Sequence, residues 1–206
     1  MSGNKEYLLV TGLLFLQLAG WMSGQAQTDT AHKKNRGEYA LVLYAGGGIS
    51  FYSGDPGTPS GLNAVEVNKV YPSATLRVMW HPDHLLRVGL ETGWNTFYSY
   101  KVNNNGITGS VHVRATPILL VFSMPIKKRI NVFAGTGGYL VHSRLDYEVV
   151  TVSKTWSLGW MAAASYTYPL GKDLGIAAEF KWQQAYETRD ANFNVQLQLR
   201  WKFLKW

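Results

Sequence analysis

The local group of side chains best suited to nucleophilic chemistry is His142, Ser143 and Asp146. A hydroxyl, an imidazole and a carboxylate are the three parts of a hydrolase triad, in which the imidazole takes the hydroxyl proton and the carboxylate orients the imidazole. Neighbouring residues of a β-strand point to opposite faces, so His142 and Ser143 cannot both face one site on a regular strand. We therefore expect no catalytic residue and a protein that is not an enzyme.

Two further histidines, His81 and His84, flank Pro82 and Asp83 in an arrangement that could suggest a metal site. Pro and Asp are also typical of turns, and we interpret this stretch as a turn with polar side chains. The sequence contains no glycine-rich phosphate loop, no zinc spacing and no calcium loop. It therefore predicts no metal and no cofactor.

The other polar and charged side chains recur in a regular pattern, which is clearest in residues 193–203. Every odd position there is apolar or aromatic, and every even position carries an amide or a positive charge. This period of two predicts a β-strand with one dry face and one wet face. The dry face points into the core of a soluble β-sandwich, but it points outward to lipid in a barrel that crosses a membrane.

The composition suits one β-rich domain and excludes several classes of protein. The 206 residues are 46% hydrophobic and include no Cys, which excludes a disulfide framework and a thiol nucleophile. The formal net charge is +7, but Lys and Arg are spread along the chain instead of being clustered. A nucleic-acid partner is not expected, because such partners require a basic patch.

The first residues have the features of a targeting segment. Lys5 precedes an apolar run over residues 7–18, and Gly24 and Ala26 are small residues at the positions that a signal peptidase recognises. The run is shorter than the roughly 20 apolar residues of a membrane helix, so a signal peptide is favoured over a single membrane helix. We expect residues 1–26 to be a signal peptide, residues 27–37 a flexible lead-in and residues 38–206 the folded domain.

Eight alternating segments follow the lead-in and predict eight antiparallel strands. They are residues 38–52, 71–80, 85–100, 107–124, 129–144, 155–168, 174–186 and 193–203. The connections after the second, fourth and sixth segments are short, whereas those after the first, third and fifth are longer. This pattern is typical of an up-and-down outer-membrane barrel with short periplasmic turns and both termini in the periplasm.

The polar faces of these segments carry charges of both signs, which are costly inside a soluble core unless they are paired. The interior of a small membrane barrel, in contrast, is filled by such side chains. We predict that a charge network closes the lumen and consists of Arg77, Arg87, Glu91, His112, Arg114, Glu179, Lys181 and Arg200. On the apolar faces, near segment ends, we predict an aromatic girdle at the lipid–water boundary, formed by Trp80, Trp94, Tyr98, Tyr100, Trp156, Tyr166, Tyr168 and Trp201.

A soluble eight-stranded calyx explains the alternation equally well, with the apolar face lining a ligand cavity and the charged face in water. The polar faces, however, are rich in Gly, Ala, Ser and Asn, whereas a solvated wall normally holds more Lys and Glu. We favour the membrane barrel. The alternatives are a secreted calyx for a small apolar ligand and a barrel enzyme that modifies lipid A.

One hairpin also resembles a known family. A Pro-Ile-Leu-Leu run at residues 117–120 precedes a short basic turn, and residues 134–140 read Ala-Gly-Thr-Gly-Gly-Tyr-Leu. This pattern resembles the central hairpin of the PorT-like outer-membrane β-barrel family of Bacteroidetes, in which Pro is usual at the position of Gly138. The resemblance implies an eight-stranded barrel similar to OmpA and OmpX, and it implies no catalytic residue because the family shares no active site.

These observations predict an all-β outer-membrane barrel of eight antiparallel strands, located in the cell outer membrane. Its expected role is envelope-structural or adhesive, or an interaction through its loops, of which residues 53–70 form the longest. The expected partners are outer-membrane lipid and an envelope or extracellular protein. The barrel-assembly machinery is a further expected partner during insertion, because the last strand is rich in aromatic residues near its end.

Overall fold

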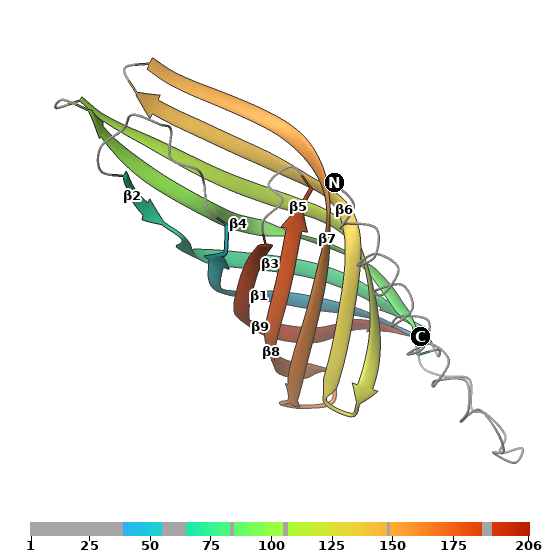
Figure 1. Cartoon of the computed structure of the whole chain (residues 1–206). Helices are drawn as coiled ribbons and strands as arrows, with labels where there is room; N and C mark the ends of the chain where they lie inside the picture. Colours follow the sequence, from blue (N-terminus) through green and yellow to red (C-terminus); the bar gives the residue numbers. More distant parts are fainter. Residues whose placement is uncertain (1–38, 55–64, 83–84, 105–106, 148, 187–190) are drawn as a thin grey trace, which may run out of the picture. The chain divides into compact units, whose positions relative to one another are not determined.

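The computed structural model of the chain describes residues 39–54, 65–82, 85–104, 107–147, 149–186 and 191–206. The predicted signal peptide and lead-in lie outside these residues. Gly37–Trp206 is one compact unit. Its described part (Figure 1) contains the strands β1 (Ala40–Tyr52), β2 (Val65–Asn68), β3 (Val70–His81), β4 (Arg87–Asn104), β5 (Ile107–Lys127), β6 (Ile130–Tyr147), β7 (Val149–Pro169), β8 (Leu174–Ala185) and β9 (Ala191–Lys205).

Eight of these strands close into an antiparallel barrel. β1 pairs with β3 and with β9, and the order continues through β8, β7, β6 and β5 to β4, which pairs with β3. The short strand β2 pairs with the outer part of β4. Closure leaves every strand of the barrel with two neighbours, which satisfies the backbone polar groups without water. The predicted all-β, eight-stranded antiparallel barrel is confirmed.

The strand register sets the tilt of the barrel. A path through paired residues that leaves β8 at Leu174 passes through every other strand of the barrel and returns to β8 at Gln184, a displacement of ten residues (184 minus 174). With eight strands, this displacement requires a tilt of roughly 40° from the barrel axis. Each residue of a strand therefore climbs roughly 2.5 Å along the axis.

The two ends of the barrel differ in length and in connections. Tyr39 and Trp206 exchange two backbone hydrogen bonds of 3.1 Å, so both ends of the described barrel chain lie at the end with the turns after β3, β5 and β7. At the opposite end, the β4–β5 and β6–β7 hairpins extend furthest (Figure 1). Residues 149–157 of β7 pair with β6 but lie beyond the end of β8.

Three segments differ from the sequence prediction. β2 lies inside the predicted connection 53–70, and β7 begins at Val149 within a stretch interpreted as a connection. In this outer hairpin polar residues occur on both faces, so the alternation that marks a strand is weak. The period of two also fails near the end of β9, where the structure has a bulge: Leu41 pairs with Leu204 and Val42 with Lys202, so Phe203 has no partner in β1.

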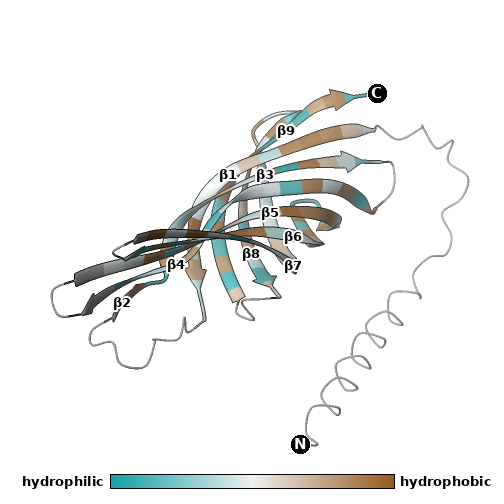
Figure 2. Cartoon of the chain, turned by 90° about the horizontal axis from the view of Figure 1, so that it is seen from above, coloured by the Kyte–Doolittle hydropathy of each residue, from teal (hydrophilic) through white to brown (hydrophobic). Residues whose placement is uncertain are grey.

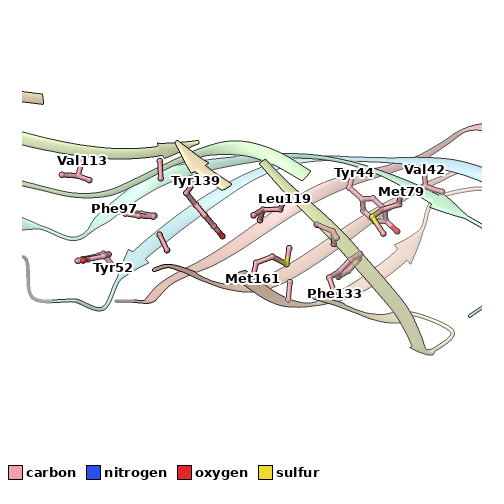
Figure 3. Close-up of a cluster of buried hydrophobic side chains, with 14 of the residues drawn as sticks. Val42, Tyr44, Tyr52, Met79, Phe97, Val113, Leu119, Phe133, Tyr139 and Met161 are labelled. Atoms are coloured by element: carbon pink, nitrogen blue, oxygen red, sulfur yellow. The ribbon is translucent and has the colours of Figure 1, made fainter. Parts of the chain in front are cut away.

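The wall of the barrel has its apolar side outside. Leu197 in β9 is 66% exposed, whereas its neighbours Gln196 and Gln198 are 2% and 1% exposed, and Figure 2 shows hydrophobic and hydrophilic residues alternating along the strands. The interior is not exclusively polar, because buried side chains such as Phe97, Leu119 and Phe133 are distributed along it (Figure 3). The interior is thus filled by a mixture of apolar, amide and charged side chains.

Candidate functional site in the barrel interior

Four charged side chains form a closed network inside the barrel. Arg77 donates from Nε to Glu91 Oε2 at 2.6 Å and from Nη1 to Glu179 Oε2 at 2.8 Å. Lys181 Nζ donates to Glu91 Oε1 at 2.6 Å and lies 3.2 Å from Glu179 Oε1. All four side chains are 0% exposed. Each carboxylate contacts both cations, so the two positive and two negative charges compensate one another.

The strand register explains how these residues meet. Arg77 and Glu91 are paired directly across β3 and β4, while Glu179 and Lys181 lie two positions apart on the inward face of β8. The closed barrel brings β8 to face β3 and β4, although Glu179 is 102 positions from Arg77 in the sequence. A buried charge that loses its partner costs several kcal/mol, so the network is favourable only when it is complete.

The groups around the network satisfy its remaining polar atoms. Lys181 Nζ lies 3.0 Å from Thr75 Oγ1, and Gln198 Nε2 donates to Glu179 Oε1 at 3.0 Å. The Arg77 guanidinium lies 4.2 Å from the ring centroid of Phe133, within cation–π distance. The charges are therefore held by hydrogen bonds and by an aromatic face as well as by one another.

Amides and aromatic rings fill further parts of the interior. Gln183 Oε1 accepts from Asn95 Nδ2 at 2.9 Å and from Asn194 Nδ2 at 3.3 Å. Towards the outer end, the rings of Tyr52 and Phe97 stack with centroids 5.9 Å apart. These side chains come from strands on several sides of the barrel, and they leave the lumen occupied by protein.

The distribution of charge and apolar surface distinguishes a membrane barrel from a soluble calyx. A calyx would place the apolar face inside and the charges in water. Here Arg77 and Lys181 are 0% exposed, whereas the outward Leu158 is 75% exposed. Such an apolar outer wall is stable in the hydrocarbon of a membrane, because exposing it to water would be unfavourable. The chain is an outer-membrane β-barrel. The predicted location in the cell outer membrane is confirmed, and the calyx alternative is wrong.

No protein-family model and no curated protein sequence matches the chain, whereas several solved structures are similar to it. Among solved structures, the outer membrane protein OprG from Pseudomonas aeruginosa matches with 10% identity and a TM-score of 0.49, covering 81% of this chain and 98% of that chain. Ail of Yersinia pestis matches with 9% identity and a TM-score of 0.46, covering 81% and 100%, and Neisserial surface protein A with 12% identity and 0.43, covering 81% and 97%. At these identities each likeness concerns the fold alone.

The structure brings together four of the eight residues predicted for the lumen network, namely Arg77, Glu91, Glu179 and Lys181. Arg87 and Arg200 instead line a cavity of about 560 Å³ at the end with the short turns, where Arg87 Nη1 donates to Asn131 Oδ1 at 3.1 Å. These two arginines belong to the mouth of the barrel and do not contact the carboxylates of the network.

The prediction that His112 and Arg114 face the lumen is wrong, because the structure places both residues on the outward face of β5. Their neighbours Val111, Val113 and Ala115 are the buried residues of this strand, whereas Arg114 is exposed. From Ala115 towards the short turn after β5, both faces of the strand are largely apolar, so the sequence did not reveal which set of alternate residues faces the lumen. The polar residues of this strand were assigned to the lumen although they lie outside it.

The predicted girdle requires a similar correction at Tyr98 and Tyr100. A bulge between Thr96 and Tyr98 shifts the register of β4 against β5, and both tyrosines then pack against the buried apolar cluster inside the barrel. The six other residues of the predicted girdle project outward and are exposed, namely Trp80, Trp94, Trp156, Tyr166, Tyr168 and Trp201. Trp160, which was not predicted to belong to the girdle, is 51% exposed on the same outer wall.

The possible triad residues do not form a catalytic arrangement. His142 is paired with Arg114, whereas Ser143, the next residue of β6, is paired with Val113 and projects from the other face. Asp146 forms its ion pair with Arg144 at 3.6 Å. Among the described residues, no group of three His, Asp or Glu side chains could hold a metal ion.

Three interior aromatic residues were not among the side chains predicted from the sequence to face the lumen. Tyr44, Phe133 and Tyr139 are all buried inside the barrel. A signal for Tyr44 was present, because this residue alternates with Leu41 and Leu43 and so falls on the face opposite to theirs. The lumen was predicted to be polar, so aromatic side chains were not predicted on the inward face.

Proposed function

We propose that the protein is a closed, non-enzymatic outer-membrane barrel with an envelope-structural role or an interaction role through its outer hairpins. The observation that carries this proposal is the network of Arg77, Glu91, Glu179 and Lys181. Its side chains reach across the lumen from β3, β4 and β8 at hydrogen-bond distances, with no exposed surface. A conducting pore needs a continuous hydrated path, and this network occupies the cross-section where such a path would run.

Planar-bilayer recording of the purified barrel tests the closed lumen. We expect no steady conductance from the wild type, and small openings from the variant Arg77→Ala/Lys181→Ala, which removes two side chains of the network. The variant Lys127→Ala/Lys128→Ala removes two charges from an exposed turn and serves as the matched control. Heat-modifiable migration on a detergent gel verifies that each variant is folded. Steady large channels in the wild type would overturn the proposal.

The outer hairpins are the part of the molecule that best suits an interaction with an envelope or extracellular protein. Residues 149–157 lie beyond the end of β8, and Val150 and Val152 are exposed there. A chain in which residues 146–151 are replaced by a two-residue turn should keep its heat-modifiable migration and lose the proteins that crosslink to the barrel on intact cells. An unchanged crosslinking pattern would assign the barrel a purely structural role.

Three finer assignments belong to the same proposal. The hairpin formed by residues 114–140 supports a relationship to the PorT-like family, and the aromatic residues near the end of β9 support recognition by the barrel-assembly machinery. We also propose that residues 1–26 are removed as a signal peptide. Mass spectrometry of the protein purified from outer membranes tests this last assignment, because cleavage after Ala26 leaves Gln27 as the first residue.

A further inference from the structure

The outer wall changes from apolar to cationic at one level of the sheet formed by β5, β6 and β7. Outward residues of β6 up to Leu140 carry no charge, and Leu140 is paired with Thr116 and Trp156. The next outward residue is His142, which is paired with Arg114 on one side and with Lys154 on the other. We call these three residues the cationic row.

The height of this row follows from the strand geometry. Ile130, at the other end of β6, is paired with Tyr166 of the exposed aromatic residues near the short turns. The ten steps from Ile130 to Leu140 climb roughly 25 Å along the axis at the tilt of this barrel. An outer-membrane barrel has an apolar band of about 25 Å. His142, at the centre of the cationic row, therefore lies directly above the hydrocarbon, at the level of the lipid headgroups, and the tilt places Arg114 and Lys154 roughly 3 Å above or below it.

The side chains of the row project towards those headgroups. Arg114 and Lys154 are exposed, and the Arg114 guanidinium lies 5.6 Å from the ring centroid of Trp94, an exposed residue of the outer wall. Directly paired residues have Cβ atoms about 5 Å apart, so the three side chains fall within roughly 10 Å of one another. This spacing allows a single anionic headgroup to contact more than one of them.

A second row extends the positive surface outward. His112 is paired with Arg144, and both line a shallow cavity of about 450 Å³ together with Arg114, His142 and Asp146. Among the described residues of this lining, Asp146 is the one carboxylate, and it lies 3.6 Å from Arg144. Arg114, Arg144 and Lys154 lie on the neighbouring strands β5, β6 and β7, and their like charges repel one another. An anion bound over the two rows would compensate the excess positive charge.

We propose that the cationic row, with His112 and Arg144 above it, binds the phosphate groups of phosphorylated glycolipids in the outer leaflet. Arg and Lys side chains bind phosphate oxygens through charge-assisted hydrogen bonds, and Arg114 can donate two of them in parallel. The apolar wall below the row, with Leu140 and Trp156, contacts the acyl chains of the same lipid. The lipid thus becomes a specific ligand of one face of the barrel. The site depends on the position of the barrel in the membrane and not on whether the lumen is closed.

Lipid retention measured by native mass spectrometry tests this site. The barrel is reconstituted in phosphatidylcholine nanodiscs that contain bisphosphorylated lipid A or the same lipid after removal of its phosphates. We expect wild-type barrel to retain the bisphosphorylated form at least tenfold better than the dephosphorylated form. The triple variant Arg114→Gln/His142→Gln/Lys154→Gln should lose this preference.

Two controls separate the site from general charge and from folding. The variant Lys127→Gln/Lys128→Gln/Lys172→Gln removes three exposed cations at the other end of the barrel and should retain the lipid as the wild type does. The charge-preserving variant Arg114→Lys/Lys154→Arg should keep most of the preference, and heat-modifiable migration reports folding. Equal retention of both lipids by the wild type, or unchanged retention by a folded triple variant, would overturn the proposal.

Discussion

Arg77 is the residue on which the interior network depends most. Its guanidinium donates to Glu91 and to Glu179, and it packs against Phe133. Without it, Lys181 alone would face two carboxylates that no water reaches. Mutual repulsion and the loss of hydration then both act against the folded state.

Arg77→Ala is therefore expected to lower the free energy of unfolding by about 3–5 kcal/mol, as for other broken buried ion pairs. Urea unfolding of the barrel in lipid bilayers, followed by Trp fluorescence, measures this change. Arg144→Ala is the matched control, because Arg144 has an exposed ion pair with Asp146, and such pairs contribute about 1 kcal/mol or less. Equal losses in the two variants would contradict a stabilising role for the buried network.

For single residues, the sequence predicted which face of the strand a side chain lies on more successfully than it predicted which residues that side chain contacts. Alternation placed Arg77, Glu91, Glu179 and Lys181 inside, but the contact between Arg77 and Glu179 spans 102 positions and depends on closure of the barrel. Arg114 was predicted on the wrong face because the half of β5 near the short turn is apolar on both faces. Leu119 and Val121 of that half face the lumen and are buried, so hydropathy could not distinguish the lumen face from the lipid face there.

The pairing of β1 with β9 closes the barrel and depends on small side chains. Gly48 is paired with Gln196, and a Cβ atom at Gly48 would overlap the carbonyl oxygen of Val195. A Cβ at Gly46 would overlap the carbonyl oxygen of Leu197 in the same way. Backbones that approach this closely accept only glycine.

Gly48→Val should consequently weaken the closure between the first and last strands. Overpacking costs about 1–3 kcal/mol in ordinary cores, and we expect the upper part of this range because the overlap is with backbone. The measurement is the fraction of heat-modifiable, folded barrel after refolding into lipid. Gly171→Val is the control, since nothing lies within 4 Å of a Cβ at that turn position. Equal folding yields for the two variants would show that β1 adjusts freely.

The end of β9 is held to the turn before β8 by an ion pair between Lys205 and Asp173. The hydrogen bond from Lys205 lowers the pKa of the Asp173 carboxyl below its ordinary value. A carboxyl with a lowered pKa stabilises the folded state fully above its ordinary pKa of about 3.9. This contribution is lost as the pH falls through the lower pKa of the folded state.

Hydrogen exchange of residues 202–206 tests this attachment. Protection factors, which correct for the pH dependence of exchange itself, should fall by about twofold to fivefold between pH 6 and pH 3 or below, a small change because the pair is exposed. Asp173→Asn should show the lower protection already at pH 6 and little further change on acidification. Protection that is the same in both proteins at pH 6 would mean that the backbone pairing of β9 is sufficient.

Strand existence was predictable at the element scale, whereas local irregularities were not. The eight predicted segments correspond to the eight strands of the barrel, because each has one face in lipid and one in the lumen. The bulges at Thr96/Tyr98 and at Phe203 insert a residue and so reverse the alternation beyond them. A pattern read with a constant period of two therefore assigned Tyr98 and Tyr100 to the wrong face.

Across the whole molecule, the alternation had two consistent interpretations that differ only in which face meets water. The calyx and the membrane barrel share strand number, order and period, so hydropathy could not separate them. Barrel closure together with burial separates them, because Lys181 is enclosed and Leu197 is exposed. A charge on the outer wall should therefore be costly in the membrane barrel and nearly neutral on a wall in water.

Leu197→Arg distinguishes these consequences directly. Leu197 lies midway between Trp201 and Phe193 in β9, near the centre of the apolar band, where an arginine costs about 2–4 kcal/mol in a membrane barrel. On a wall in water the same substitution would be nearly neutral.

Val150→Arg is the control, because Val150 is 52% exposed on the outer hairpin, above the cationic row. For barrels refolded into lipid vesicles, we expect the free energy of unfolding to fall by about 2–4 kcal/mol for Leu197→Arg and by less than about 0.5 kcal/mol for Val150→Arg. Equal stabilities of the two variants would contradict a lipid-facing outer wall.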